Sequence, residues 1–277
     1  TFNKNQEGRF TRHFLFQQKE NQNMHTIDEV ILRMDQIVAE CRSKSSRIGY
    51  FAILYRQVTI RIKNGILNSE FEDNPRMEKL DVLFAKRFID AYDAFQSGQK
   101  PTASWAHAFE AANSTKHLVL QHLLLGINAH INLDLGIAAV ETIDGHDLES
   151  LQNDFNKINA VLAELVDGVK DNIGFISPFF KTLIRFAKGK EEILVNFSIK
   201  LARDGAWKFA WKYQASSDKI EAIQKRDKAI TLLAKGLINP GIKLRLWVWL
   251  IGLAEWKSVP EIMDQLDKAS ITPISVT

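Results

Sequence analysis

The segment QHLLLGINAHINLDL, residues 121–135, is strongly hydrophobic, yet it carries polar side chains on two sides of a helix. At about 100° of rotation per residue, the amide side chains share one stripe. These are Gln121, Asn128 and Asn132. On the opposite side lie two ionisable groups, His130 and Asp134. Because a surface helix has a single polar face, two opposed polar stripes predict a central helix, at about 115–142, enclosed by other helices.

Helical periodicity recurs along most of the chain. Thr26 and Glu29 have the spacing of a capping box, which predicts the start of the first helix. Pro75 suits the first turn of a helix that runs to Tyr92, after a loop at 68–77. Further helices are expected at about 46–66, 105–112, 148–168, 178–187, 190–213, 217–235 and 241–256. No segment has a clear strand period, so we expect a single all-α, bundle-like domain over 24–270 and a flexible tail at 271–277.

The charge of the chain is concentrated at its start. The formal net charge is +3, and residues 1–23 hold four basic and two acidic side chains, which is +2 of that total. The remainder is nearly neutral, which argues against a nucleic-acid partner, since such partners need a concentrated basic face. Residues 1–23 also lack periodicity and a secretory apolar core, so we interpret them as a disordered leader. A partner-binding arm is the alternative.

A single cysteine, Cys41, excludes an internal disulfide and a cysteine-rich zinc site. We therefore expect a reducing compartment, the cytoplasm. The apolar, Trp-rich stretch at 246–256 is too short to cross a bilayer, which takes about 20 apolar residues, so no transmembrane segment is expected. A packed helix is the simpler interpretation of this stretch. Peripheral membrane contact is the alternative, because Lys243 and Arg245 flank it.

The ionisable stripe is the best candidate for chemistry. His130 and Asp134 are one helical turn apart, so they can share a divalent metal, or the carboxylate can orient the imidazole. A metal site needs further ligands from elsewhere. Asp81 is the first candidate, because it shares a helix face with Phe84 and Phe88, and Asp154 is the second. The sequence contains no G-x-S-x-G, P-loop, G-x-G-x-x-G or H-E-x-x-H motif.

Several stretches together resemble the uncharacterised bacterial domain-of-unknown-function family 5995. They are YRQVT (55–59), FEDNPRMEKLDVLFAKRF (71–88), SWAHAFEA (104–111), LQHLLLGINAHINLDL (120–135), DFNKINAVL (154–162) and ARDGAWKFA (202–210). The pattern N-A-H-I-N-x-D-L is the most specific part. The resemblance implies a helical domain over about residues 26–213 and a shortlist of acidic and aromatic positions, but no reaction. Those positions match Asp81, Trp105, Asp154 and Trp207.

Two classes of function are compatible with these residues. The first is an enzyme or binder of a small or lipid-like molecule, with its site between the central helix and its neighbours. Its acid–base or metal-binding groups would be His130, Asp134, Asp81 and Asp154, with the metal held by the first three. Its other ligand contacts would be Asn128, Asn132, Gln121 and Trp105. The second class is a structural or interaction module in which the same polar groups are interhelical hydrogen-bond clamps.

Overall fold

A computed structural model describes residues 24–158, 161, 199–239, 252, 255 and 257–269. These residues form helices and connecting loops with no strand among them, which confirms the predicted all-α class. In chain order the elements are α2 (Ile27–Ser43), α3 (Ile48–Leu67), α4 (Asn74–Gln96), α5 (Ala103–Ala111), α6 (Val119–Ala129), the π-helical turn η1 (His130–Asp134), α7 (Leu135–Ile143), the 3₁₀ turn η2 (Leu148–Leu151), α10 (Ile199–Ala215), α11 (Lys219–Ile238) and α13 (Val259–Ala269).

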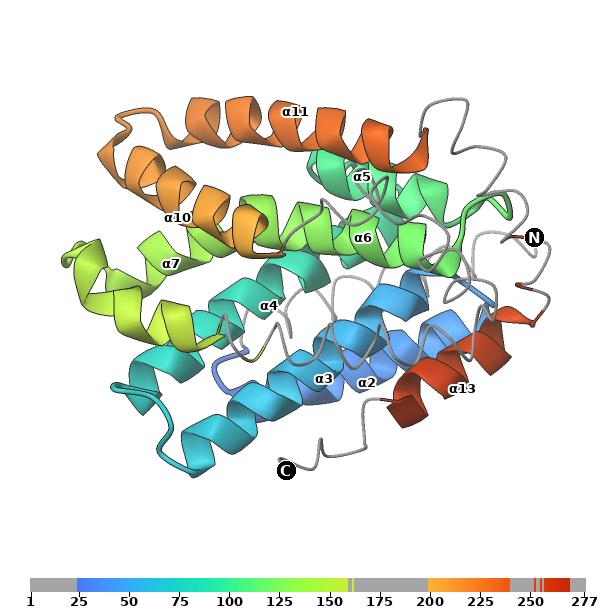
Figure 1. Ribbon diagram of the computed structural model, residues 1–277, viewed down its shortest axis with the longest axis horizontal. Coiled ribbons are helices and arrows are strands. Elements are labelled where there is room, and N and C mark those ends of the chain that lie inside the picture. The colour runs from blue at the N-terminus through green and yellow to red at the C-terminus, as the bar shows by residue number, and fades with distance from the viewer. Residues whose placement is uncertain are drawn as a thin grey trace, which may run out of the picture.

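A continuous rod made of α6, η1 and α7 runs through the middle of the molecule (Figure 1). Helices α10 and α11 cover one side of this rod, and α2, α3 and α4 form the layer on the other side (Figure 1). Helix α5 packs beside α6 and α11. Every residue from Gln121 to Ala139 is buried, so the predicted central helix is confirmed.

The helix ends follow local chemistry that the sequence partly predicts. The capping box at Thr26 and Glu29 is formed in both directions. Asp73 caps α4, and Pro75 lies in its first turn. The central helix begins at Val119 rather than near 115, because the side chain of Gln121 accepts a hydrogen bond from the Leu118 amide at 3.0 Å and closes the first turn there. The predicted helix at 148–168 opens as a 3₁₀ turn and is helical over 152–158.

Other predicted segments lie wholly or partly outside the described residues. The leader at 1–23, the helices at 178–187 and 241–256, and the tail at 271–277 are among them. Helix α13 is described but was not predicted. Its start carries an overlooked signal, since Ser258 accepts from the Glu261 amide while the Glu261 carboxylate accepts from the Ser258 amide. Helix α13 packs on α2 and α3, where it buries Met263.

The rod is apolar enough to raise the question of a membrane span. In the part of the chain that the structure describes, residues Val119–Ile143 form one helical stretch long and apolar enough to cross a bilayer. Ninety-four per cent of its most apolar window is buried inside the fold. The core helix of a globular protein meets the same criteria of length and composition, so the stretch gives little information about membranes.

Gly126 allows α3 to approach the rod closely. A Cβ atom at this position would lie 2.5 Å from the Phe51 ring, so the ring or the helix would have to shift within a closely packed core. We therefore expect Gly126→Ala to lower the free energy of unfolding by about 1–3 kcal/mol. Gly236→Ala is the matched control, because nothing lies within 4 Å of its added Cβ and Ala favours helix, so it should stabilise. Urea denaturation of both variants is the measurement, and equal effects would contradict this explanation.

Candidate functional site

The helix that carries both polar stripes changes its geometry where the ionisable residues lie. Over His130–Asp134 the backbone forms a π-helical turn, and the Leu135 amide bonds to the His130 carbonyl five residues earlier. Single π-turns within long helices are uncommon and occur frequently at functional sites. The regular rotation of about 100° per residue does not predict this turn. The two polar stripes nevertheless face different neighbouring helices.

The amide stripe faces α11 and holds it. Gln121 donates to the Leu237 carbonyl at 2.9 Å, and Asn128 donates to the Ile230 carbonyl at 3.0 Å. Asn132 donates to the side-chain oxygen of Asn128 at 3.1 Å. These amides were predicted both as clamps and as ligand contacts. All three side chains are hydrogen-bonded within the protein, and their role as ligand contacts stays a prediction.

The ionisable stripe faces α4 and α5, and its carboxylate is fully engaged. Asp134 accepts hydrogen bonds from the Trp105 indole at 2.8 Å and from the Arg87 guanidinium at 3.2 Å. The imidazole nitrogen Nδ1 of His130 lies 3.2 Å from the same carboxylate. Trp105 was expected to contact a ligand, and it instead holds Asp134. Arg87 was missed, although it adjoins Phe88 on the α4 face singled out in the sequence.

His130 is a neutral base with one free nitrogen. Its ring stacks on Phe84 with 3.6 Å between centroids, and burial lowers its pKa. An ionised carboxylate can only accept, so Nδ1 carries the proton and donates to Asp134. That tautomer leaves a lone pair on Nε2, which has no hydrogen-bond partner in the described part of the fold. Asp134 therefore orients the imidazole of His130, and the acceptor nitrogen Nε2 of that ring is unused among the described residues.

Asp81 is another buried group with unused hydrogen-bonding capacity. Its side chain is 1% exposed, and neither carboxyl oxygen has a hydrogen-bond partner among the described residues. Burial, and then the charge of Glu78, raises the pKa of Asp81 to about 8. The carboxyl is therefore mostly protonated at neutral pH. Phe84 and Phe88 lie on the same buried face of α4, as predicted.

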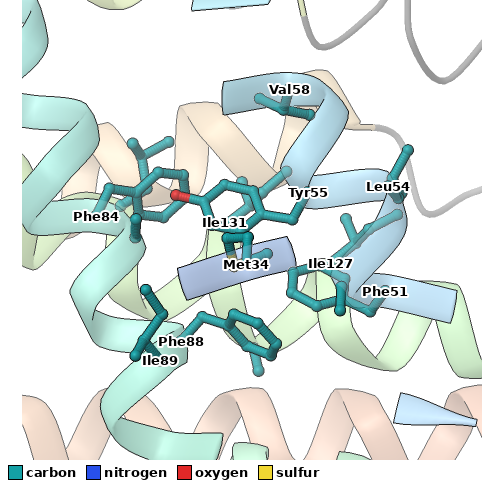
Figure 2. Packing of buried hydrophobic residues seen from close by; sticks show 14 of the residues in the cluster. Met34, Phe51, Leu54, Tyr55, Val58, Phe84, Phe88, Ile89, Ile127 and Ile131 are labelled. Atoms are coloured by element: carbon teal, nitrogen blue, oxygen red, sulfur yellow. The ribbon is translucent and has the colours of Figure 1, made fainter. Parts of the chain in front are cut away.

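Tyr55 of α3 lies near both Asp81 and the His130–Asp134 pair. The sequence did not single out this tyrosine. Its ring lies 4.3 Å from the His130 ring and 5.6 Å from the Phe84 ring, centroid to centroid. Figure 2 shows the hydroxyl end of Tyr55 directed toward Phe84. Burial raises its pKa, and the charges of Asp81 and Asp134 raise it further, so the hydroxyl lies within electrostatic range of both carboxyls. The available signal was a tyrosine on the mostly apolar first half of α3.

Asp154 has a different environment from the other predicted site residues. Its buried carboxylate accepts from the backbone amides of Glu72 and Asp73 at 2.7 and 3.2 Å, and from Arg76 at 3.1 Å. These partners are in the loop and first turn that begin α4. Asp154 therefore anchors the α3–α4 connection, and we do not retain it as a catalytic residue.

Replacing Asp154 by Ala should destabilise the protein by about 3 kcal/mol, because two amides and a guanidinium lose one buried acceptor. Asp147→Ala is the milder comparison, since Asp147 makes an exposed capping bond to the Glu149 amide. Its loss should cost about 1 kcal/mol. Thermal or urea denaturation measures both. If Asp154→Ala costs no more than Asp147→Ala, the anchoring role is wrong.

The predicted metal set is not assembled in this arrangement. Across the described ranges, no three side chains from His, Cys, Asp and Glu are arranged to hold one metal ion. The carboxylate of Asp134 is already shared by Trp105, Arg87 and His130.

Comparison with known proteins gives a family and no function. A family model described as "Family of unknown function (DUF5995)" matches residues 27–240, which is most of the chain. No curated protein and no solved structure gives a significant match. Helix α13 lies beyond the matched range, whereas His130, Asp134, Asp81 and Tyr55 all lie inside it.

Proposed function

Because the chain belongs to the DUF5995 family, whose description assigns no activity, we propose from the geometry that it binds a small molecule between α3, α4 and η1. His130 is the proposed general base, held in one tautomer by Asp134. Asp81 is the proposed carboxyl that contacts the ligand. The single observation that carries this proposal is that two of the unpartnered buried groups, the Nε2 atom of His130 and the carboxyl of Asp81, both lie near the Tyr55 side chain.

A purely structural core would not retain these two groups, because buried polar atoms without partners lower the stability of the fold. A buried polar atom without a partner costs about 1–3 kcal/mol, whereas an apolar residue of similar shape at the same place costs little. Functional sites commonly carry such unfavourable groups, because activity and not stability maintains them. A ligand that donates to His130 and hydrogen-bonds to Asp81 would supply both missing partners.

The lining limits the class of ligand. Aromatic rings surround the imidazole, with Phe51, Phe84 and Trp105 each within 6 Å of it, centroid to centroid. Such a lining favours a small, largely apolar molecule with a few polar atoms. His130 is 2% exposed and Asp81 1%, so ligand entry requires the rings or helices to move. Conformational opening of this kind is common in enzymes that exclude water from the reaction.

The alternative is a non-enzymatic structural or interaction module. The engaged amides of Gln121 and Asn128, and the shared carboxylate of Asp134, favour it for those residues. It gives no role to the free nitrogen of His130. The two proposals therefore differ on whether that nitrogen acquires a partner.

The test is a fragment screen read at the histidine rings by NMR. The chain has seven histidines, and His130→Gln identifies the His130 signals. We expect some fragments to shift the Nε2 resonance of His130 and to lose binding in His130→Gln. His122→Gln is the matched control, since His122 is also buried and its ring nitrogens also lack hydrogen-bond partners among the described residues, but its ring contacts Tyr50 and His117 outside the proposed site. If fragments that bind the protein never perturb His130, or none bind at millimolar concentration, the structural module is the better explanation.

A further inference from the structure

Asp81 is a buried acid for which the described fold provides no cation. The charged neighbour that affects it is Glu78, which has the same sign. The arginines on the same helix are committed elsewhere, Arg76 to Asp154 and Arg87 to Asp134. The carboxyl is therefore not half of an ion pair within this part of the chain.

The groups around Asp81 suit a cation with an apolar body. Phe84 lies one turn further along α4. Tyr55 approaches from α3, and the charge of Asp81 raises the pKa of its hydroxyl. The faces of such rings attract ammonium groups, most strongly where water is excluded. A positively charged nitrogen with N–H donors would also satisfy the two carboxyl oxygens that now lack partners.

We propose that the ligand of this site carries an organic ammonium group that binds Asp81, with its apolar part against Tyr55 and Phe84. This inference rests on the proposed function and specifies its ligand class. On binding, the O–H bond of the Asp81 carboxyl breaks and the proton leaves to water, while the carboxylate pairs with the cation. The ammonium and the proton therefore compete for the same group.

The competition predicts how binding depends on pH. The titratable groups of the proposed site, besides Asp81, are Glu78 on α4, Tyr55 on α3, and His130 with Asp134 on η1. Since the pKa of Asp81 is raised to about 8, affinity for the cation should rise about tenfold per pH unit from pH 5 to 7. It should level off above pH 8, where the carboxyl is already ionised.

The experiment compares phenethylammonium with the neutral phenethyl alcohol on the full chain, at pH 6 to 8. Like the ammonium of Lys, the alkylammonium stays largely protonated over this range. We expect phenethylammonium to bind with the predicted pH dependence and to release protons, as measured by calorimetry in two buffers. Asp81→Asn should abolish its binding, and a cooperative thermal transition at or above the wild-type temperature will show that this variant is folded.

Glu78→Gln provides a second, independent variant. Glu78 accepts a bond from the Ile27 amide, which Gln also can do, so the substitution removes charge and keeps the contact. The lower pKa of Asp81 in this variant should shift the affinity profile to lower pH. Binding that is independent of pH, or unaffected by Asp81→Asn, would overturn the ammonium assignment.

The outcomes also separate this inference from the function on which it rests. If phenethyl alcohol perturbs the His130 signals while phenethylammonium does not bind, the ligand class is wrong and the binding site remains. If neither molecule binds and the fragment screen is also negative at His130, both proposals fail.

Discussion

Asp81→Asn should stabilise the protein at pH 8 by an amount on the order of 5 kcal/mol, and by little at pH 4. The reason is that the buried carboxyl keeps its proton up to about pH 8 in the folded chain, whereas in the unfolded chain it ionises near pH 4. Between these values the folded state binds one more proton. Wild-type stability from this group therefore falls by about 1.4 kcal/mol per pH unit as pH rises through this window.

The variant removes that slope because Asn resembles the neutral acid in size and has no charge to bury. Urea denaturation of both proteins at pH 4.5, 6 and 8 measures the difference. Asp35→Asn is the control, since the Asp35 side chain is 52% exposed and pairs with Arg56 at the surface. Its effect should stay within about 1 kcal/mol at every pH. A stability difference between Asp81→Asn and wild type that does not grow with pH would show that the carboxyl has an undetected partner.

Asp134→Ala should have the opposite effect, a loss of about 3–5 kcal/mol at neutral pH. The substitution removes the partner of three groups at once: the Trp105 indole, the Arg87 guanidinium and His130 Nδ1. An indole N–H without a partner and a partly buried cation without its counter-ion are both costly. For a chain of this length the transition temperature should fall by roughly 10 °C.

Asp134→Asn is the informative comparison. It keeps one oxygen for Trp105 and loses the charge that balances Arg87, so its cost should lie between those of wild type and Asp134→Ala. Differential scanning calorimetry measures all three. Should Asp134→Ala be as stable as Asp81→Asn, the contrast between an engaged and an unengaged carboxyl would be wrong.

This contrast marks the limit of what could be predicted from the sequence. The all-α class and the buried central helix follow from periodicity, because Gln121 and Asn128 on one side and His130 on the other leave no solvent face. Periodicity could not decide whether a given polar side chain is an interhelical hydrogen-bond clamp or part of a binding site. That role depends on whether a partner atom comes within about 3 Å. Trp105 and Arg87, from other helices, supply such atoms to Asp134, whereas none reaches Asp81 among the described residues.

The same reasoning explains the individual misses. Asp154 resembled a site residue because it is an acid on an apolar face, and only the tertiary position of the loop at 72–76 shows its role. Tyr55 carries no distinctive signal in the sequence, because an aromatic residue on an apolar helical segment is most often part of the core. The π-turn leaves no distinctive residue pattern, since it is a change in hydrogen-bond partner.

The π-turn also separates the rod into two halves whose rotational settings are fixed independently. In α6, Gln121 and Asn128 fix the angle relative to α11, while in α7 the close approach of Gly136 to the Ala206 carbonyl of α10 fixes the angle. A π-turn accommodates one more residue than an α-helical turn of the same rise. Removing one residue between 130 and 134 would therefore restore a regular helix without rotating α7 relative to α6. Gly136 would still face α10, so the extra residue affects the local positions of His130 to Asp134 rather than the packing of the two halves of the rod.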